Sequence, residues 1–294
     1  ERQYEAIRIC TADNLGSVRE ACRCLSVSPS AYYKWKSGSS SQRFQENKHI
    51  ASLIEKIHID SPDKGYRRIH DDLERFHNVH SNDKRILRIC RSLGIQSTVK
   101  FHPVGCTRHA RTPQHYSENI LNREFHAEKP NEKWLTDVTE FKYYEGPRVK
   151  KVYLSAILDL YDRRIVAFVI RDTNDNKLVF DTFAKAVQRN PDAHPIFHSD
   201  RGFQYTNRYF YQRLVNAGMI QSMSRVGRCI DNGPMEGFWG ILKRERYYGK
   251  RFTNRTELVK MIRSYIHYYN TKRLQRNLGV LTPMEKHDRY LKAD

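Results

Sequence analysis

The sequence predicts an α/β protein in which a mixed sheet, with three antiparallel strands and then alternating helices and strands, follows small all-α domains. Two observations support this fold class. Residues 17–93 carry apolar residues at helical spacing between polar caps, whereas β-branched and aromatic runs predominate from Trp134 onwards. Between them, residues 101–131 show no periodicity and contain three prolines. We therefore expect the main domain boundary in this connector.

Composition limits the kind of function. A chain of 294 residues suggests two or three domains, since a domain typically has roughly 100 to 200 residues. The formal charge of +19 favours a polyanionic partner, and nucleic acid is the leading candidate. No apolar run approaches the roughly 18 residues that cross a bilayer, so we expect a cytoplasmic protein with no membrane partner. The chain begins at Glu1 without Met, which is expected of a fragment or a processed product.

The first expected domain, residues 1–40, carries two short helices. Ser17 and Glu20 form a capping box for one, and Ser28 followed by Pro29 begins the next. This pattern is typical of a helix-turn-helix, whose second helix lies in the DNA major groove. A plain helical hairpin is the alternative. The residues of the second helix that we expect to contact DNA are Tyr33, Lys34 and Lys36.

A second small helical DNA-binding domain is expected at residues 45–100, after the polar linker run SGSSSQ. Its helices are predicted at 50–59, 66–76 and 83–93. The basic residues favour contact with phosphates, although a solvated basic face explains them equally well. The residues expected to contact DNA are Arg67, Arg68, Lys84, Arg85 and Arg88.

Four residues of the connector, at irregular spacing, are compatible with a zinc site but are better explained as ordinary loop residues. They are His102, Cys106, His109 and His115. The six cysteines of the chain form no CxxC pair, and we expect reduced thiols.

The third part, residues 132–248, has the pattern of a catalytic core. Strands are predicted at 134–144, 149–162, 164–170, 195–200 and 219–223, and helices at 176–188, 207–217 and from Glu236 onwards. This order describes the ribonuclease-H-like fold, which gathers carboxylates from its first strand, its fourth strand and a late helix into one cleft. Residues 249–294 are expected to form a basic helical C-terminal tail, because from residue 241 onwards 14 Lys or Arg face 5 Asp or Glu.

Three carboxylates occupy those positions, and we expect Asp137, Asp200 and Glu236 to be catalytic and to bind metal. Clustered carboxylates repel one another unless a cation is present, and their hard oxygens select Mg²⁺, for which Mn²⁺ can substitute. Two such ions would support in-line phosphoryl transfer. Asp137 would be shared by both, with the other two carboxylates each completing one site. Lys243 and Arg244, on the same helix as Glu236, are expected to hold phosphate groups of DNA.

Each carboxylate also has a plainer explanation. Asp137 could be a polar residue at a strand edge, but an unpaired charge in the apolar run WLTDVTEF would be costly. Asp200 could merely begin a turn. Glu236 competes with Asp231, which we interpret as a turn or cap residue, and with Glu245, which we expect to be solvated. Asp159 in the second strand is expected only to support the cleft.

Four runs, in order, resemble the reading-frame-B transposases of the IS-three (IS3) family of insertion sequences, which have a DDE integrase core of the retroviral-integrase superfamily. The runs are PNEKWLTDVTEF (130–141), HSDRGFQYT (198–206), SRVGRCIDNGPMEGFWGILKRE (224–245) and HYYNTKRLQRNLGVLTPMEK (267–286). The run GYRRI (65–69) is similar to the helical domain that precedes this core. The resemblance implies a Mg²⁺-dependent DNA strand transferase whose DDE residues are Asp137, Asp200 and Glu236.

The resemblance also implies the partners. Family members bind the terminal inverted repeats of their element, nick a 3′ end, form a circle and integrate it into target DNA. Two DNA ends must meet, so we expect a homodimer or a larger assembly on DNA. In the family an upstream frame supplies a leucine zipper, and no sustained leucine heptads occur in this chain. Two alternatives stay open: a ribonuclease-H-like metal-dependent nuclease, and a non-catalytic DNA-binding regulator derived from a transposase.

Overall fold

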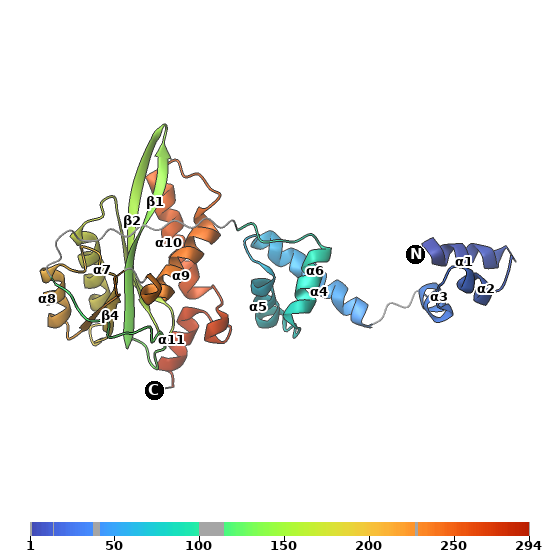
Figure 1. The fold of residues 1–294 in the computed structure, drawn as a ribbon, viewed down its shortest axis with the longest axis horizontal. Coiled ribbons are helices and arrows are strands. Elements are labelled where there is room, and N and C mark those ends of the chain that lie inside the picture. Colours follow the sequence, from blue (N-terminus) through green and yellow to red (C-terminus); the bar gives the residue numbers. More distant parts are fainter. Residues whose placement is uncertain (1, 14, 38–41, 100–114, 227–228, 294) are drawn as a thin grey trace.

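The computed structural model describes residues 2–13, 15–37, 42–99, 115–226 and 229–293, and its elements follow one another along the chain in three groups (Figure 1). The first group is α1 (Arg2–Ala12), α2 (Val18–Cys24) and α3 (Pro29–Lys36). The capping box of Ser17 and Glu20 begins α2 as expected, and Pro29 begins α3. The sequence pattern did not predict α1, which buries only one of its residues.

The second group is α4 (Gln42–Asp60), α5 (Tyr66–His77) and α6 (Asp83–Ser92). The three helices share one apolar core of isoleucine and leucine side chains. The helix α4 begins eight residues before the predicted start at Ile50, because the earlier residues bury nothing and so carry no apolar period. The side chain of Asn82 accepts a hydrogen bond from the Arg85 N–H and caps α6.

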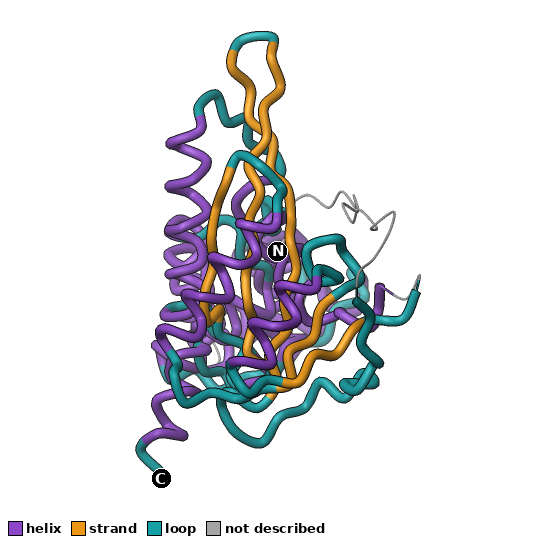
Figure 2. Tube along the Cα trace, turned by 90° about the vertical axis from the view of Figure 1, so that its left-hand side faces the viewer, coloured by secondary structure: helices purple, strands orange, loops and turns teal. Residues whose placement is uncertain are grey.

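The third group contains a five-stranded mixed sheet of order β3-β2-β1-β4-β5, which confirms the predicted α/β class. Its elements are β1 (Lys133–Glu145), β2 (Arg148–Asp159), β3 (Ile165–Arg171), α7 (Asn176–Arg189), β4 (Ile196–Ser199), α8 (Arg208–Asn216) and β5 (Ile220–Met223). The first three strands pair antiparallel, and β4 pairs in parallel with both β1 and β5. Figure 2 shows the long β1–β2 hairpin extending beyond the rest of the sheet.

After β5 come η1 (Cys229–Asn232), α9 (Gly233–Leu242), the π-helical turn η2 (Lys243–Tyr247), α10 (Arg255–Thr271), η3 (Arg276–Leu278) and α11 (Pro283–Leu291). The side chains of successive residues in β1 point to opposite faces of the sheet, because a strand is pleated. Leu135 joins a core with α9 and α10, whereas Trp134 joins a core with α7 and α8. Both faces are therefore covered by helices (Figure 1). Within the described ranges, no helix has both the length and the apolar character needed to cross a membrane.

Candidate active site

Parallel strand pairing brings two of the predicted carboxylates together. In the pairing of β1 with β4, Leu135 lies beside His198. Asp137 and Asp200 each lie two residues further along their segments, so they lie next to each other at the point where β4 ends and β1 continues. Asp200 is the first residue after β4 and begins a turn. The Gly202 N–H donates a hydrogen bond to its Oδ1 over 2.8 Å.

The helix α9 supplies the third carboxylate and is bound to β1 at two points. The Asn232 side chain, just before α9, donates to the carbonyl oxygen of Thr136 over 3.1 Å. The indole N–H of Trp239 donates to Oδ2 of Asp137 over 3.0 Å. Glu236 lies between these two contacts, in the first turn of α9, with an exposed side chain. Both contacts therefore fix the helix that carries Glu236 against the strand that carries Asp137.

The carboxylates influence one another electrostatically. Burial and the negative charge of Asp200 raise the pKa of Asp137 to about 8, against the lowering effect of hydrogen bonds from the Val138 N–H and Trp239. Burial and the charge of Asp200 also raise the pKa of Glu236. The three carboxyl groups therefore interact electrostatically, and an ionised neighbour makes ionisation of Asp137 and of Glu236 less favourable.

The hydroxyl of Tyr205 lies beneath this cluster and contacts Oγ1 of Thr136 at 3.2 Å. Burial first, and then the charges of Asp137 and Asp200, raise the pKa of Tyr205 well above its ordinary value. Tyr205 therefore stays a neutral hydroxyl at physiological pH. It adds no fourth negative charge to the site.

This donor set fits a divalent cation chemically, because hard carboxylate oxygens bind such ions and the charge of an ion would offset the repulsion among them. The side chains do not form a closed cage, however. Among the residues that the structure describes, no three His, Cys, Asp or Glu side chains gather closely enough to hold an ion. The expected three-carboxylate ligand group is thus only partly assembled in this conformation.

His198, two residues before Asp200, is fully buried and has partners at both ring nitrogens. Its Nδ1 lies 2.9 Å from Oγ of Ser222, and its Nε2 lies 3.1 Å from Oγ of Ser224. Burial lowers the pKa of His198 to about 4, so the ring is neutral near pH 7. No local sequence pattern distinguishes this histidine from an ordinary strand residue. In the structure it joins β4 to β5 and supports the segment that ends in Asp200.

Comparisons with known proteins bear on this fold and site. Residues 127–229 match the family model of an integrase core domain, residues 236–291 match a second integrase core domain model, and residues 45–101 match an HTH-like domain. An uncharacterized transposase-like protein of Haemophilus influenzae is 42% identical over 210 residues, which cover 70% of this chain and 93% of that protein. The putative transposase InsK for insertion sequence element IS150 of Escherichia coli is 35% identical over 86% of this chain and 87% of its own length. The chain belongs to the IS3 family of insertion-sequence transposases.

A further relative of the transposase is InsF for insertion sequence IS3A of Escherichia coli, which is 29% identical over 94% of this chain and 95% of its own length. Among solved structures, the HTLV-2 integrase catalytic core domain in complex with magnesium is similar, with 18% identity and a TM-score of 0.42 over 54% of this chain and 97% of that one. The integrase core models and the transposase relatives identify the protein as a DDE-type DNA transposase with a ribonuclease-H-like integrase core. It binds DNA, and a core of this type indicates dependence on a divalent metal.

Lys243 ends α9 and begins the π-helical turn of the transposase. Its Nζ lies 5.3 Å from the centre of the Phe141 ring. Phe141 is four residues beyond Asp137 in β1 and therefore shares its face of the sheet. Lys243 thus lies along the same strand face as the carboxylates, and Arg244 follows it in the same turn.

Most of the other residues expected to contact DNA are exposed on their helices. These are Tyr33, Lys34, Lys36, Arg67, Lys84 and Arg88. Lys84 and Arg88 line a groove of about 880 Å³ between the start of α4 and α6. Arg85 also lines it, but its guanidinium is already held by Asn47 at 2.8 Å and Glu46 at 3.0 Å.

Arg68, which the sequence predicts as a DNA contact, instead lies against acidic side chains, and its side chain is only 19% exposed. Asp63 is 3.2 Å away and Glu245 is 2.8 Å away, and the side chain also donates to the Tyr268 hydroxyl over 2.7 Å. Its positive charge is therefore paired with carboxylates inside the protein.

Glu245 and Asp231, the two acidic residues considered as alternatives to Glu236, also have partners that the sequence did not indicate. Glu245 is not solvated, because its side chain is 7% exposed and accepts hydrogen bonds from Arg68, Arg273 and Tyr265. Asp231 is more than a turn or cap residue. It is fully buried and binds Arg225 at 2.8 Å and Arg123 at 2.6 Å.

Asp159 does not support the carboxylate cleft. It pairs with Trp134 in the sheet, whereas Asp137 pairs with Ala156. It accepts hydrogen bonds from the Trp134 indole and from the Asn131 N–H, and so fixes the entry into β1. Burial and the charge of Asp162 raise the pKa of Asp159 to about 6.

Of the residues considered as zinc ligands, His102, Cys106 and His109 lie outside the described residues. His115 stacks on the ring of Tyr211, with ring centres 3.8 Å apart, and contacts Oγ of Ser117 at 3.0 Å. It thus has the environment of an ordinary packed histidine.

Proposed function

We propose that Asp137, Asp200 and Glu236 are the catalytic carboxylates of this transposase and that they hold two Mg²⁺ ions, for which Mn²⁺ can substitute. The observation that supports this most strongly is the equal register of Asp137, within β1, and Asp200, directly after the parallel strand β4. The hydrogen bond from Trp239 to Asp137 also holds α9, the helix that carries Glu236, against β1. When bound, the ions would activate the attacking oxygen and stabilise the leaving oxygen of a phosphodiester.

The reaction that we propose is nicking at the terminal inverted repeats of the element, followed by transfer of the freed 3′ end to form a circle and then to integrate into target DNA. In this scheme Trp239 orients Oδ2 of Asp137. Lys243 and Arg244 hold phosphates beside the reacting strand, since both follow α9 along the same strand face.

DNA would be held by the helical regions as well. We propose that residues 1–40 and 45–100 are DNA-binding domains, that residues 132–248 form the catalytic core, and that residues 249–294 form a C-terminal helical region. The exposed residues Tyr33, Lys34, Lys36, Arg67, Lys84 and Arg88 are the proposed contacts to phosphates and bases. A homodimer or larger assembly would hold the two DNA ends together, in the bacterial cytoplasm on nucleoid DNA.

The test is a strand-joining assay with duplex DNA that carries the inverted repeat of the element, in Mg²⁺ or Mn²⁺. Wild-type protein should give products longer than the substrate strand. Asp137→Asn should remove both nicking and joining while the protein still binds DNA. The matched control is Asp192→Asn, the same chemical change at an exposed position after α7, which should leave joining unchanged. Shorter products alone from wild-type protein would instead identify a nuclease.

A further inference from the structure

A set of ion pairs joins the helical domain, defined as residues 42–99, to the C-terminal segment, defined as residues 243–291. Each side supplies both acids and bases. The pairs, with the helical-domain residue first, are Arg68–Glu245, Arg75–Glu285, Asp63–Arg246, Asp71–Arg276 and Asp83–Arg276. In a chain with a formal charge of +19, this concentration of acidic partners at one interface indicates specific recognition between the two parts.

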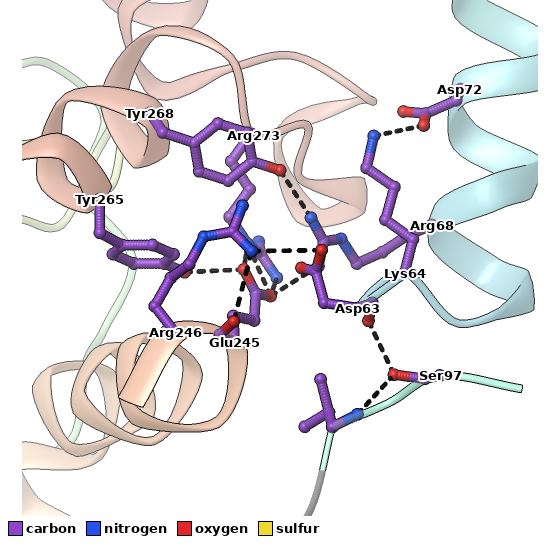
Figure 3. A network of polar contacts seen from close by, with 11 residues as sticks. Asp63, Lys64, Arg68, Asp72, Ser97, Glu245, Arg246, Tyr265, Tyr268 and Arg273 are labelled. Carbon is purple, nitrogen blue, oxygen red and sulfur yellow. Dashed lines mark hydrogen bonds and ion pairs between the residues drawn. The ribbon is translucent and has the colours of Figure 1, made fainter. Parts of the chain in front are cut away.

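Glu245 is the centre of this interface (Figure 3). Its carboxylate lies 2.8 Å from the guanidinium of Arg68 in the helical domain and 2.9 Å from that of Arg273 after α10. The Tyr265 hydroxyl donates to it over 2.9 Å. Arginines from both parts thus share one buried acid. Loss of either arginine would leave the buried carboxylate of Glu245 without one of its positively charged partners.

Arg276 is a second centre of the interface. Its Nε donates to Asp71 over 2.6 Å, and its two terminal nitrogens donate to the two oxygens of Asp83 over 2.8 and 2.9 Å. A two-pronged arginine–carboxylate contact of this kind fixes orientation as well as distance. The hydrogen bonds from Arg276 and His70 hold the pKa of Asp83 well below its usual range.

The interface is charged rather than apolar. The core of α4, α5 and α6 and the core that includes α9 and α10 are separate clusters, and neither cluster of described residues contains side chains of the other part. Attraction across the interface therefore comes from ion pairs and hydrogen bonds. Salt screens the more exposed of these pairs, Arg75–Glu285 and Asp83–Arg276, far more than it weakens an apolar core.

The interface also includes the C-terminal end of α9, the helix that carries Glu236. The turn η2, which contains Glu245 and Arg246, continues α9 without a break. Ile241 of α9 lines a cavity of about 280 Å³ together with Tyr66 and Arg67 of the helical domain. The helix α9 is thus bound to β1 through Asn232 and Trp239, and the turn that continues its C-terminal end is bound to the helical domain.

We propose that this charged interface is a docking surface through which the helical domain holds the C-terminal end of α9, so that strand transfer requires the docked arrangement. The link to strand transfer rests on the catalytic role proposed for Glu236, whereas the docking itself does not. DNA bound to the helical domain would then be held in a fixed position relative to the carboxylates.

The test compares Arg276→Gln with Arg289→Gln in the full chain. Both changes remove one arginine charge from the C-terminal segment, but Arg289 is exposed on α11 and lies outside the interface pairs. Small-angle X-ray scattering should show a larger radius of gyration for Arg276→Gln, and a larger one for the wild type as salt is raised. Joining should fall about tenfold or more in Arg276→Gln, the scale expected for loss of one member of a hydrogen-bonded charge pair. The control should match the wild type in both measurements.

Asp83→Asn changes the helical-domain partner in the same Arg276–Asp83 contact. Combined with Arg276→Gln it should cost little more than Arg276→Gln alone, because both changes remove one shared interaction. An unchanged radius of gyration in Arg276→Gln and in high salt would overturn docking. An increased radius with undiminished joining would overturn the requirement for docking. An increased radius together with failure of the Asp137→Asn test would leave docking standing and remove the catalytic assignment.

Discussion

The indole N–H of Trp239 donates a hydrogen bond to Oδ2 of Asp137 over 3.0 Å, and this contact joins α9 to β1 three residues after Glu236. The N–H of Val138 donates to the other oxygen, Oδ1, over 2.7 Å. Both oxygens of Asp137 are thus oriented by hydrogen bonds within the protein. Groups that orient a metal ligand in this way typically affect metal affinity or activity about 10- to 100-fold.

We therefore expect Trp239→Phe to weaken catalysis while preserving the fold, because phenylalanine retains an aromatic ring but has no N–H donor. Joining should fall by about tenfold or more, and a higher Mg²⁺ or Mn²⁺ concentration should be needed for half-maximal activity. Metal titrations of joining rate measure both effects. Phe238→Leu, a change in the core beside it, should lower thermal stability without changing the metal concentration required. An equal metal requirement in Trp239→Phe and wild type would contradict the orienting role.

Gly202 should be irreplaceable for a local steric reason. A Cβ added there would lie 2.9 Å from Oδ1 of Asp200, closer than real Cβ contacts allow. Gly202→Ala should therefore displace Asp200 and abolish joining, while circular dichroism shows a folded protein. Gly237→Ala is the contrasting variant, because nothing lies within 4 Å of an added Cβ in α9. It should raise stability by about 0.5 to 1 kcal/mol, since glycine is unfavourable within a helix.

The metal-free protein should lose thermal stability as pH rises from about 5 to 8. The pKa of Asp137 is about 8 in the folded protein, above the value of about 3.9 expected in an unfolded chain. The folded state therefore holds a proton that the unfolded state releases, and stability is lost as pH rises through the folded pKa. Melting temperatures measured with EDTA should show this slope, and Asp137→Asn should reduce it. Excess Mg²⁺ should stabilise the wild type most at the alkaline end, where the carboxylates are ionised.

His198 should produce the opposite slope at acid pH. Its folded pKa of about 4 lies below the value of about 6.5 expected in an unfolded chain. The neutral ring therefore contributes stability that is fully present above about pH 6.5 and is lost as pH falls through 4. Thermal melts between pH 7 and 4 should show this loss, worth about 3 kcal/mol for a shift of this size. His198→Asn should have a lower melting temperature at pH 7 and a shallower acid slope. A slope equal to that of the wild type would rule out His198 as its source.

The succession of strands and helices along the chain and the choice of candidate carboxylates could be predicted from the sequence, because both depend on local patterns. Alternating runs locate β1 and the segment ending in Asp200, and parallel pairing then brings Asp137 and Asp200 side by side. The role of Glu245 could not be predicted in this way. Its partner Arg68 lies far away in the chain, and a glutamate among basic residues on a helix usually faces solvent. Only the folded chain shows that an arginine from the helical domain neutralises it.

Two other differences have similarly local causes. The helix α1 and the first turns of α4 bury few residues, so the apolar period that normally reveals a helix is missing from them. Asp159 follows an apolar strand run just as Asp200 does, but the register of β2 pairs it with Trp134, whose side chain lies on the other face of the sheet from that of Asp137. Strand register, which short runs do not encode, decides which acidic residues meet.

The reciprocal pairs of Arg68 with Glu245 and of Asp83 with Arg276 restrict how this protein can be recombined with its relatives. A chimera that takes its helical domain from another transposase would place foreign side chains against Glu245 and Arg276, and would function only if the matching C-terminal residues were exchanged with it. The DNA-recognition module and the end of the chain would therefore be inherited together, even though more than 150 residues separate Asp83 from Arg276.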